Sequence, residues 1–237
     1  MEPANDKVLG VLGGMGPLAS AHFMLRLTQL TPATRDQDHI PTVLWSDPRV
    51  PDRTNGRLGG GADPLPFLLR GIAGLRRAGC GAIVIPCNTA HGWYEEMQAE
   101  AGCPILHIVD AAAAELRRLG IAGGAIGVMG TQGTLDMRLY QDRLGRQGWD
   151  CLTPTPAEMQ RLVTPAIALV KANRVADAYA PLAEAAQLLT ARGASAVVLG
   201  CTEIPLGLQA GPAETLDLTL VDTIDALARA AIRWARG

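Results

Sequence analysis

Lysine is nearly absent from this chain of 237 residues, and features typical of several protein classes are missing as well. No apolar run approaches the roughly 18 residues that a membrane span needs, so we expect no membrane partner. The residues before the first strand-like run do not resemble a secretion signal, and we expect a cytoplasmic protein. A net charge of −2 forces no basic face on the protein, so nucleic acid is not an expected partner.

The cysteines number five, which is odd, and no Cys-x-x-Cys pair occurs. A disulfide framework or a structural metal site is therefore not expected. The 21 basic residues include only Lys7 and Lys171 as lysines. Lys171 is kept as a candidate functional residue, with an ordinary surface position as the alternative.

Apolar residues make up 48% of the chain and charged residues 19%, as in globular proteins. Short apolar runs alternate with helical patterns along the whole length. This alternation predicts an α/β fold with mainly parallel sheets, and the fully apolar strands indicate that helices cover both faces. The predicted strands are 7–12, 42–46, 82–86, 105–109, 125–129, 150–153, 196–199 and 219–221.

The two halves of the chain share three collinear matches. Residues 8–16 match 125–133 at an offset of 117, and 79–87 match 193–201 at an offset of 114. Residues 108–110 match 220–222 at an offset of 112. A glycine after the first strand is common to βα units, but a cysteine at the same strand end in both halves is not. We therefore predict two similar domains related by internal duplication.

The first domain is predicted to span 1–106 together with 219–237, and the second 107–218. In this arrangement the strand and helix from Thr219 onward return to the first domain. Ligands of open α/β sheets bind at the carboxyl ends of strands. We therefore expect the active site in the cleft between the domains, with Cys87 and Cys201 on opposite walls.

Cys87 and Cys201 each lie where a predicted strand ends and a predicted helix begins. This position favours the thiolate and lowers a thiol pKa. A symmetric pair of thiols can remove a proton from one face of a carbon and return one to the other face. The alternatives are a redox pair and inert buried thiols, the second of which is our interpretation of Cys80, Cys103 and Cys151.

A glycine-rich turn follows the first strand, and Gly14–Ala19 fits the loose form of a dinucleotide fingerprint. Asp36 and Asp38 lie near the spacing expected for a ribose carboxylate, but before the next strand rather than at its end. A second such turn lies at the corresponding position of the other half. We therefore interpret both turns as backbone N–H donors for a small carboxylate ligand.

These motifs resemble those of the cofactor-independent aspartate/glutamate racemases, in particular the aspartate racemase branch. The resemblance runs from about Lys7 to the last helix. It is carried by LGGMGPLA at 12–19, PRVPDRT at 48–54, IPCNTAH at 85–91, TPT at 153–155, VK at 170–171 and LGCTE at 199–203. Ser46-Asp47 departs from the family pattern, in which two asparagines commonly precede the proline.

The resemblance implies roles for individual residues. Cys87 and Cys201 would be the two acid/base residues, and Arg53 and Lys171 would hold the side-chain carboxylate of the substrate. The remaining substrate-binding residues would hold its α-carboxylate and amino group: Met15, Asn88, Thr89, Thr131 and Thr202. Asp52 and Glu203 could orient the thiols, and His91 is as consistent with a capping or core role as with a catalytic one.

The sequence thus predicts a racemase that interconverts L- and D-aspartate without pyridoxal phosphate, other cofactors or metals, with glutamate as a second candidate substrate. The resemblance also implies a homodimer. Another two-cysteine epimerase or isomerase of a carboxylate substrate is the first alternative. A dehydrogenase that binds NAD(P) and a non-catalytic amino-acid-binding protein are the others.

Overall fold

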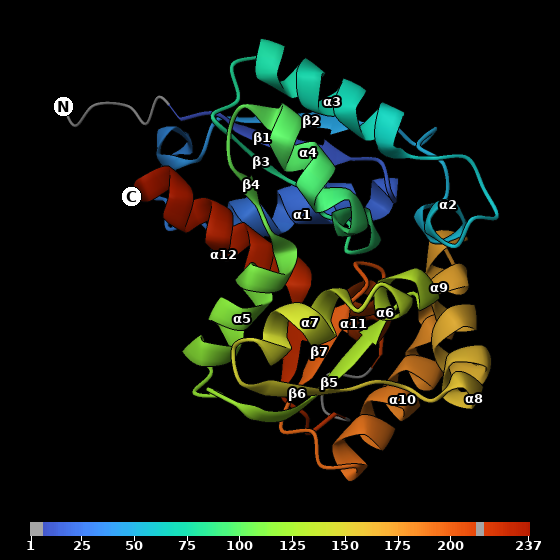
Figure 1. The fold of residues 1–237 in the computed structure, drawn as a ribbon. Coiled ribbons are helices and arrows are strands. Elements are labelled where there is room, and N and C mark those ends of the chain that lie inside the picture. Colours follow the sequence, from blue (N-terminus) through green and yellow to red (C-terminus); the bar gives the residue numbers. More distant parts are fainter. Residues whose placement is uncertain (1–6, 212–215) are drawn as a thin grey trace. The chain divides into compact units, whose positions relative to one another are not determined.

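Two units, each built on a four-stranded parallel sheet, make up the computed structural model, which describes residues 7–211 and 216–237 (Figure 1). They comprise Met1–Ala111 with Ile224–Gly237, and Ala112–Thr223. Residues 1–6, for which we expect no secretion signal, lie outside the described residues. Within the part of the chain that is described, no helix is long and apolar enough to cross a membrane.

The sheet of the first unit has the order β2-β1-β3-β4. Its strands are β1 (Leu9–Gly13), β2 (Thr42–Ser46), β3 (Ala82–Val84) and β4 (Ile105–Leu106). The helices are α1 (Pro17–Leu30), α2 (Arg53–Arg57), α3 (Leu65–Arg77), α4 (Tyr94–Ala101), the start of α5 (Ile108–Arg118) and α12 (Thr223–Arg236). Bidentate bonds of 2.6 Å from Arg26 to Asp225 join α1 to α12.

Successive residues of β1 face opposite sides of the sheet, and both sides are covered. A Cβ added at Gly10 would lie 3.2 Å from the side chain of Leu75 on α3, whereas one at Gly13 would overlap Ser20 on α1. Glycine at these positions lets the two helices pack close to the strand. The β1 strand is buried along its full length as a result.

The sheet of the second unit has the corresponding order β6-β5-β7-β8. Its strands are β5 (Gly124–Gly130), β6 (Trp149–Leu152), β7 (Val197–Gly200) and β8 (Leu220–Asp222). The helices are α6 (Gln132–Asp136), α7 (Leu139–Gly145), α8 (Pro156–Glu158), α9 (Thr164–Lys171), α10 (Tyr179–Ala191) and α11 (Ile204–Gln209), with a π-helical stretch at Met159–Val163.

The two sheets also pair their strands at corresponding residues of the sequence repeat. Gly10 pairs with Ile83 in the first sheet, and Gly127 pairs with Val197 in the second, at the two sequence offsets of 117 and 114. Leu189 on α10 stands 3.0 Å from a Cβ added at Gly127, as Leu75 stands near Gly10. The predicted α/β class with two similar parallel sheets is confirmed.

Two details of the sequence interpretation are wrong. The strand expected over 105–109 ends at Leu106, and Ile108 already begins α5. The strand expected to return to the first domain from Thr219 instead pairs as β8 with β7 in the second sheet, while α12 belongs to the first unit. The helix rather than the strand therefore makes the return to the first unit.

Candidate functional site

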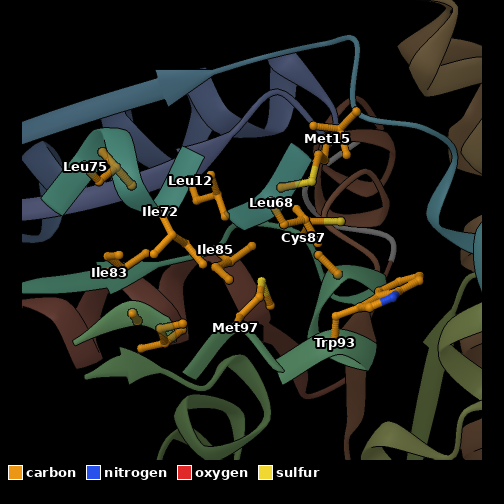
Figure 2. Packing of buried hydrophobic residues seen from close by; sticks show 14 of the residues in the cluster. Leu12, Met15, Leu68, Ile72, Leu75, Ile83, Ile85, Cys87, Trp93 and Met97 are labelled. Atoms are coloured by element: carbon orange, nitrogen blue, oxygen red, sulfur yellow. The ribbon is translucent and has the colours of Figure 1, made fainter. Parts of the chain in front are cut away.

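Cys87 lies just beyond the carboxyl end of β3, within a buried hydrophobic cluster of the first unit. The residue is 4% exposed, and its main-chain N–H donates to the carbonyl of Ile85 at 2.8 Å. Figure 2 shows the side chains of Met15, Leu68 and Cys87 gathered at one end of this cluster. The strand end thus brings a thiol next to the glycine-rich turn after β1.

His91 fixes the main chain at Cys87. Its Nδ1 lies 2.9 Å from the carbonyl oxygen of Cys87, and the N–H of Ile108 donates to its Nε2 at 3.2 Å. Because Nε2 accepts, Nδ1 carries the proton and donates to Cys87. The His91 ring also packs on His107, with centroids 4.8 Å apart. This buried imidazole has the structural role that the sequence left open.

Asn88 and Thr89 continue the chain from Cys87 into a 3-10 turn, Thr89–Trp93, that leads into α4. Both residues are almost fully buried, at 2% and 5% exposure. Buried polar side chains at a strand end are suited to hydrogen-bonding a small ligand or the local main chain. The structure thus places three of the candidate residues, Cys87, Asn88 and Thr89, in one consecutive buried segment.

The glycine-rich turn between β1 and α1 is held by Ser20. The Gly14 N–H donates to Ser20 Oγ at 2.9 Å, and this hydroxyl donates to the Gly16 carbonyl at 2.8 Å. Gly14 has φ +93°, and a Cβ there would overlap the main chain of Asp47. Glycine is therefore required where the turn passes the end of β2.

Arg53, at the start of α2, reaches back to this turn. Its Nη2 donates to the carbonyl of Met15 at 3.1 Å, and its Nη1 donates to the carbonyls of Val50 and Pro51 at 3.3 and 3.1 Å. The Asp52 side chain caps α2 by accepting from Asn55 N–H at 2.8 Å. Met15 and Arg53 are thus brought together, and Asp52 has a capping role.

Asp36 and Asp38 are the acidic residues weighed for a dinucleotide, and Asp47 is a further acidic residue near β2. Asp36 and Asp38 form a 3-10 turn before β2, and Asp38 pairs with Arg35 at 2.9 Å. Asp47 directly follows β2 and binds Arg49 through both carboxylate oxygens, at 2.8 and 2.9 Å. These bonds lower the pKa of Asp47 to about 2. Neither pattern matches a carboxylate held open for a ribose hydroxyl.

Cys201 follows the last residue of β7 in the second unit, and its thiol has an acidic partner. The Sγ atom donates to Oε2 of Glu203 at 3.0 Å, and the Thr202 hydroxyl donates to the same oxygen at 3.3 Å. All three residues are at most 5% exposed. Sequence reasoning gave Glu203 little weight, although its position two residues after the cysteine was a signal.

The pKa of Cys201 lies well above its ordinary value. Burial is the largest cause, followed by the charge of Glu203 and the hydrogen bond to it, while Lys171 acts in the opposite direction. The lowered pKa expected from a strand-end, helix-start position is therefore wrong at this residue. Cys201 rests as a thiol, the form that can deliver a proton.

Tyr140 on α7 is a further buried polar residue beside Cys201, and sequence reasoning missed it. Its ring lies 3.0 Å from a Cβ added at Gly200, and its hydroxyl bonds to Thr223. Burial, with Cys201 next in importance, raises the pKa of Tyr140 far above its ordinary range. At an offset of 117 the first half has Phe23, so only the second unit has a hydroxyl here.

The remaining candidates of the second unit are Thr131 and Lys171. Thr131 caps α6 by accepting from the N–H of Thr134 at 3.1 Å. Lys171 ends α9 with an exposed side chain, and its charge reaches Cys201. In the second unit the charge of Lys171 therefore acts on Cys201, while Thr131 caps the helix after β5.

The other three cysteines lie in the protein as free thiols. Burial raises the pKa of Cys80 and Cys103, and it raises that of Cys151 to about 11. Among residues 7–211 and 216–237, no three His, Cys, Asp or Glu side chains group as metal ligands would.

Comparisons with known proteins find similarity to racemases. The family model described as Asp/Glu/Hydantoin racemase matches residues 12–231. The chain is 29% identical over 170 residues to the broad specificity amino-acid racemase RacX of Bacillus subtilis, covering 69% of this chain and 71% of RacX. It is 31% identical over 199 residues to the glutamate racemase of Deinococcus radiodurans, covering 82% of this chain and 62% of that relative.

A solved structure shows the same fold over nearly the whole chain. The aspartate racemase of Picrophilus torridus superposes with a TM-score of 0.84 at 29% sequence identity. The superposition covers 97% of this chain and 94% of that one. The fold class predicted from the alternating pattern is therefore also that of a solved racemase structure.

Proposed function

The chain belongs to the Asp/Glu/hydantoin racemase family, and from this premise we propose that it interconverts L- and D-aspartate by proton transfer at Cα between two cysteines. The observation that carries the proposal is the repeated position of Cys87 and Cys201, each after the same strand of a repeated sheet. The printed name of the Picrophilus torridus protein supports aspartate as the first substrate to test.

In the proposed reaction one sulfur begins as a thiolate and the other as a thiol. The thiolate removes the Cα proton and becomes a thiol, and the electron pair left on Cα is delocalised into the α-carboxylate. The second thiol then gives its proton to the opposite face of Cα and becomes a thiolate. Substrate and product differ only in configuration, and the two sulfurs have exchanged protonation states.

Glu203 gives Cys201 a route to the thiolate form. The carboxylate already accepts the thiol hydrogen bond, so it can take the proton when Cys201 acts as the base, and it releases that proton to water after Cys201 has become a thiol again. In the other direction Cys201 acts as the acid from its resting thiol form. No pyridoxal phosphate or metal is part of this proposed sequence of proton transfers.

The ligand is proposed to be held by main-chain and side-chain donors. The turns at Met15 and Thr131, with Asn88, Thr89 and Thr202, hold its α-carboxylate and amino group. These donors also limit the charge that develops on the carboxylate as the proton leaves. Lys171 and Arg53 supply positive charge for the acidic side chain, and we further propose that the chain forms a homodimer.

The proposal is tested by incubating L-aspartate with the purified protein in D₂O, without added cofactor, followed by chiral chromatography and mass spectrometry. We expect deuterated D-aspartate from the wild type and none from Cys87→Ser or Cys201→Ser, because a serine hydroxyl is far too weak an acid to replace the thiolate. Cys103→Ser is the matched control and should retain the wild-type rate. Unlabelled L-aspartate from the wild type would overturn aspartate racemisation.

Glutamate, asparagine and alanine complete the substrate panel. The similarity to a broad specificity amino-acid racemase makes this panel necessary. Turnover of glutamate at the rate of aspartate would make the activity one toward acidic amino acids in general. Turnover of alanine at that rate would remove the proposed role of the side-chain carboxylate.

A further inference from the structure

A chain of two hydrogen bonds ends at the strand that precedes Cys201. The Thr223 hydroxyl donates to the carbonyl of Leu199 on β7 at 2.8 Å. The side chains of Tyr140 and Thr223 are also hydrogen-bonded to each other. Because the one hydroxyl proton of Thr223 is engaged at Leu199, the Tyr140 hydroxyl is the donor in this second bond. Both side chains are fully buried, so the chain of bonds fixes a carbonyl two residues before Cys201.

The ring of Tyr140 lies beside the end of the same strand. A Cβ added at Gly200 would stand 3.0 Å from Cε2 and 3.5 Å from Cδ2 of this ring. Glycine therefore lets α7 bring the ring close to the last residue of β7. Cys201 is the next residue, and after burial it is the largest cause of the raised pKa of Tyr140. Tyr140 thus packs against the strand end with its ring and holds Leu199 through its hydroxyl.

The first half of the chain fixes the corresponding residues with a different side chain. The pairing of the last two strands in each sheet has an offset of 115 between the halves, so Ile108 corresponds to Thr223. Each of these residues begins the helix that follows the sheet. In the first unit His91 accepts from the Ile108 N–H and donates to the Cys87 carbonyl. In both units, therefore, this helix start is tied by hydrogen bonds to the segment that carries the cysteine.

The repeat also separates the ring of Tyr140 from its hydroxyl. At an offset of 117 the first half has Phe23, which is equally buried on α1. The aromatic ring therefore recurs in the repeat, whereas the hydroxyl belongs to the second unit alone. A buried hydroxyl is unfavourable unless it is hydrogen-bonded, and this one bonds toward the strand that carries a cysteine at its end.

We infer that Tyr140 and Thr223 are positioning residues that hold the thiol of Cys201 in place. The inference rests on the proposed function, in which Cys201 is one of two acid/base residues. Without the Thr223 hydroxyl, the Leu199 carbonyl loses a partner and the end of β7 becomes less rigid. The bond of 3.0 Å from Cys201 to Glu203 should then be broken for part of the time. A displaced acid/base group slows proton transfer more than it weakens substrate binding.

The kinetic test removes each hydroxyl in turn. Tyr140→Phe and Thr223→Val should each lower the kcat for L-aspartate about tenfold and change its KM by less than about twofold. The double variant should lose no more than either single variant, because the two hydroxyls act as one chain. Thr223→Ser keeps the hydroxyl and should recover most of the kcat that Thr223→Val loses. An additive loss in the double variant, or no recovery in Thr223→Ser, would overturn the inference.

A measurement without substrate separates this inference from the proposed function. Iodoacetamide labels free thiols, and mass spectrometry of the peptides gives a rate for each cysteine. In ligand-free Thr223→Val the labelling of Cys201 should be about tenfold faster than in the wild type, because a thiol released from its place is less shielded. Cys151, on β6 of the same sheet, should keep its wild-type rate and so reports any general loosening of the second unit. Tyr94→Phe is the matched control, since it removes a tyrosine hydroxyl bonded to the Ile105 carbonyl, and it should leave Cys201 labelling unchanged.

The two proposals can fail separately. Unchanged labelling of Cys201 in Thr223→Val, or an equal rise at Cys151, overturns the inference even if racemisation is confirmed. A rise confined to Cys201 supports it even if aspartate is not the substrate. If Thr223→Val does not fold, Tyr140→Phe takes its place with Cys87 as the internal control, and the same outcomes decide.

Discussion

The thiol of Cys201 donates a hydrogen bond to the carboxylate of Glu203, with 3.0 Å between Sγ and Oε2. At the same offset from Cys87 the first half has Thr89, which carries no charge. The two cysteines therefore occupy equivalent places in the repeat but different chemical surroundings. In the proposed reaction one cysteine starts as the thiol and the other as the thiolate. Different chemical surroundings are needed if the same cysteine is to be the thiol in the resting protein.

Replacing Glu203 with glutamine should lower the pKa of Cys201. The negative charge and the hydrogen bond of Glu203 both raise that pKa, so their removal should shift it downward. The pH dependence of thiolate ultraviolet absorbance measures the shift, with the matching Cys201→Ser protein subtracted in each case. Glu184→Gln, at a 46% exposed side chain, is the control. An unchanged or higher midpoint in Glu203→Gln would contradict the assignment.

The sequence predicted the repeated sheets because their pattern is local. Gly10 and Gly127 match in sequence and also match in register, against Ile83 and Val197. Helices α3 and α10 are each followed by a glycine in the left-handed conformation, and these glycines also correspond: Gly79 has φ +84° and Gly193 has φ +100°. Such features follow from strand periodicity and glycine placement, which a single sequence displays.

The third sequence match was misaligned for a physical reason. It compared 108–110 with 220–222, but the first segment begins α5 and the second is β8. The N–H of Ile83 donates to Pro104, and the N–H of Val197 donates to Thr219, which gives an offset of 115 instead of 112. A shared Val-Asp pair is too short to distinguish a strand end from a helix start.

The surroundings of the thiols could be predicted only in part. Cys87 and Cys201 followed from the repeat, but the bonds of Arg53 to the Met15 carbonyl depend on how α2 approaches the turn. The contact of Tyr140 with Gly200 likewise arises from the packing of α7 on β7. Contacts between segments distant in sequence leave no periodic pattern, so sequence reasoning missed them.

Gly14→Ala should be strongly destabilising. The added Cβ would overlap the Asp47 main chain, and the left-handed φ of +93° adds strain of its own. We expect the free energy of unfolding to fall by about 2 kcal/mol or more, measured by urea denaturation. Gly59→Ala is a matched control, because Gly59 has φ +82° but no atom within 4 Å of the added Cβ. Equal losses in the two variants would show that the contact with Asp47 is unimportant.

Asp47 should contribute stability that depends on pH. Hydrogen bonds from the Arg49 side chain and main chain lower its pKa from 3.8 to about 2. Since the folded value is the lower one, the stabilisation is present above about pH 4 and is lost as the pH falls toward 2. The urea midpoints of wild type and Asp47→Asn should therefore differ at pH 6 and converge near pH 2. For the control Asp142→Asn the urea midpoint should differ little from that of the wild type at either pH. A difference in urea midpoint between Asp47→Asn and wild type that persists near pH 2 would contradict this assignment.

His91→Phe should separate hydrogen bonding from ring packing. Phenylalanine keeps an aromatic ring against His107 but leaves the Cys87 carbonyl and the Ile108 N–H without their partner. Two unsatisfied buried groups should cost about 3 kcal/mol of unfolding free energy. Because one of them belongs to Cys87, we also expect slower proton exchange at Cα of aspartate in D₂O at temperatures where the variant is fully folded. His22→Phe is the control, since His22 Nε2 is buried without a hydrogen bond among the described residues. That variant should lose little stability, and an equal loss in both would assign the effect of His91→Phe to the size of the ring instead of the hydrogen bonds.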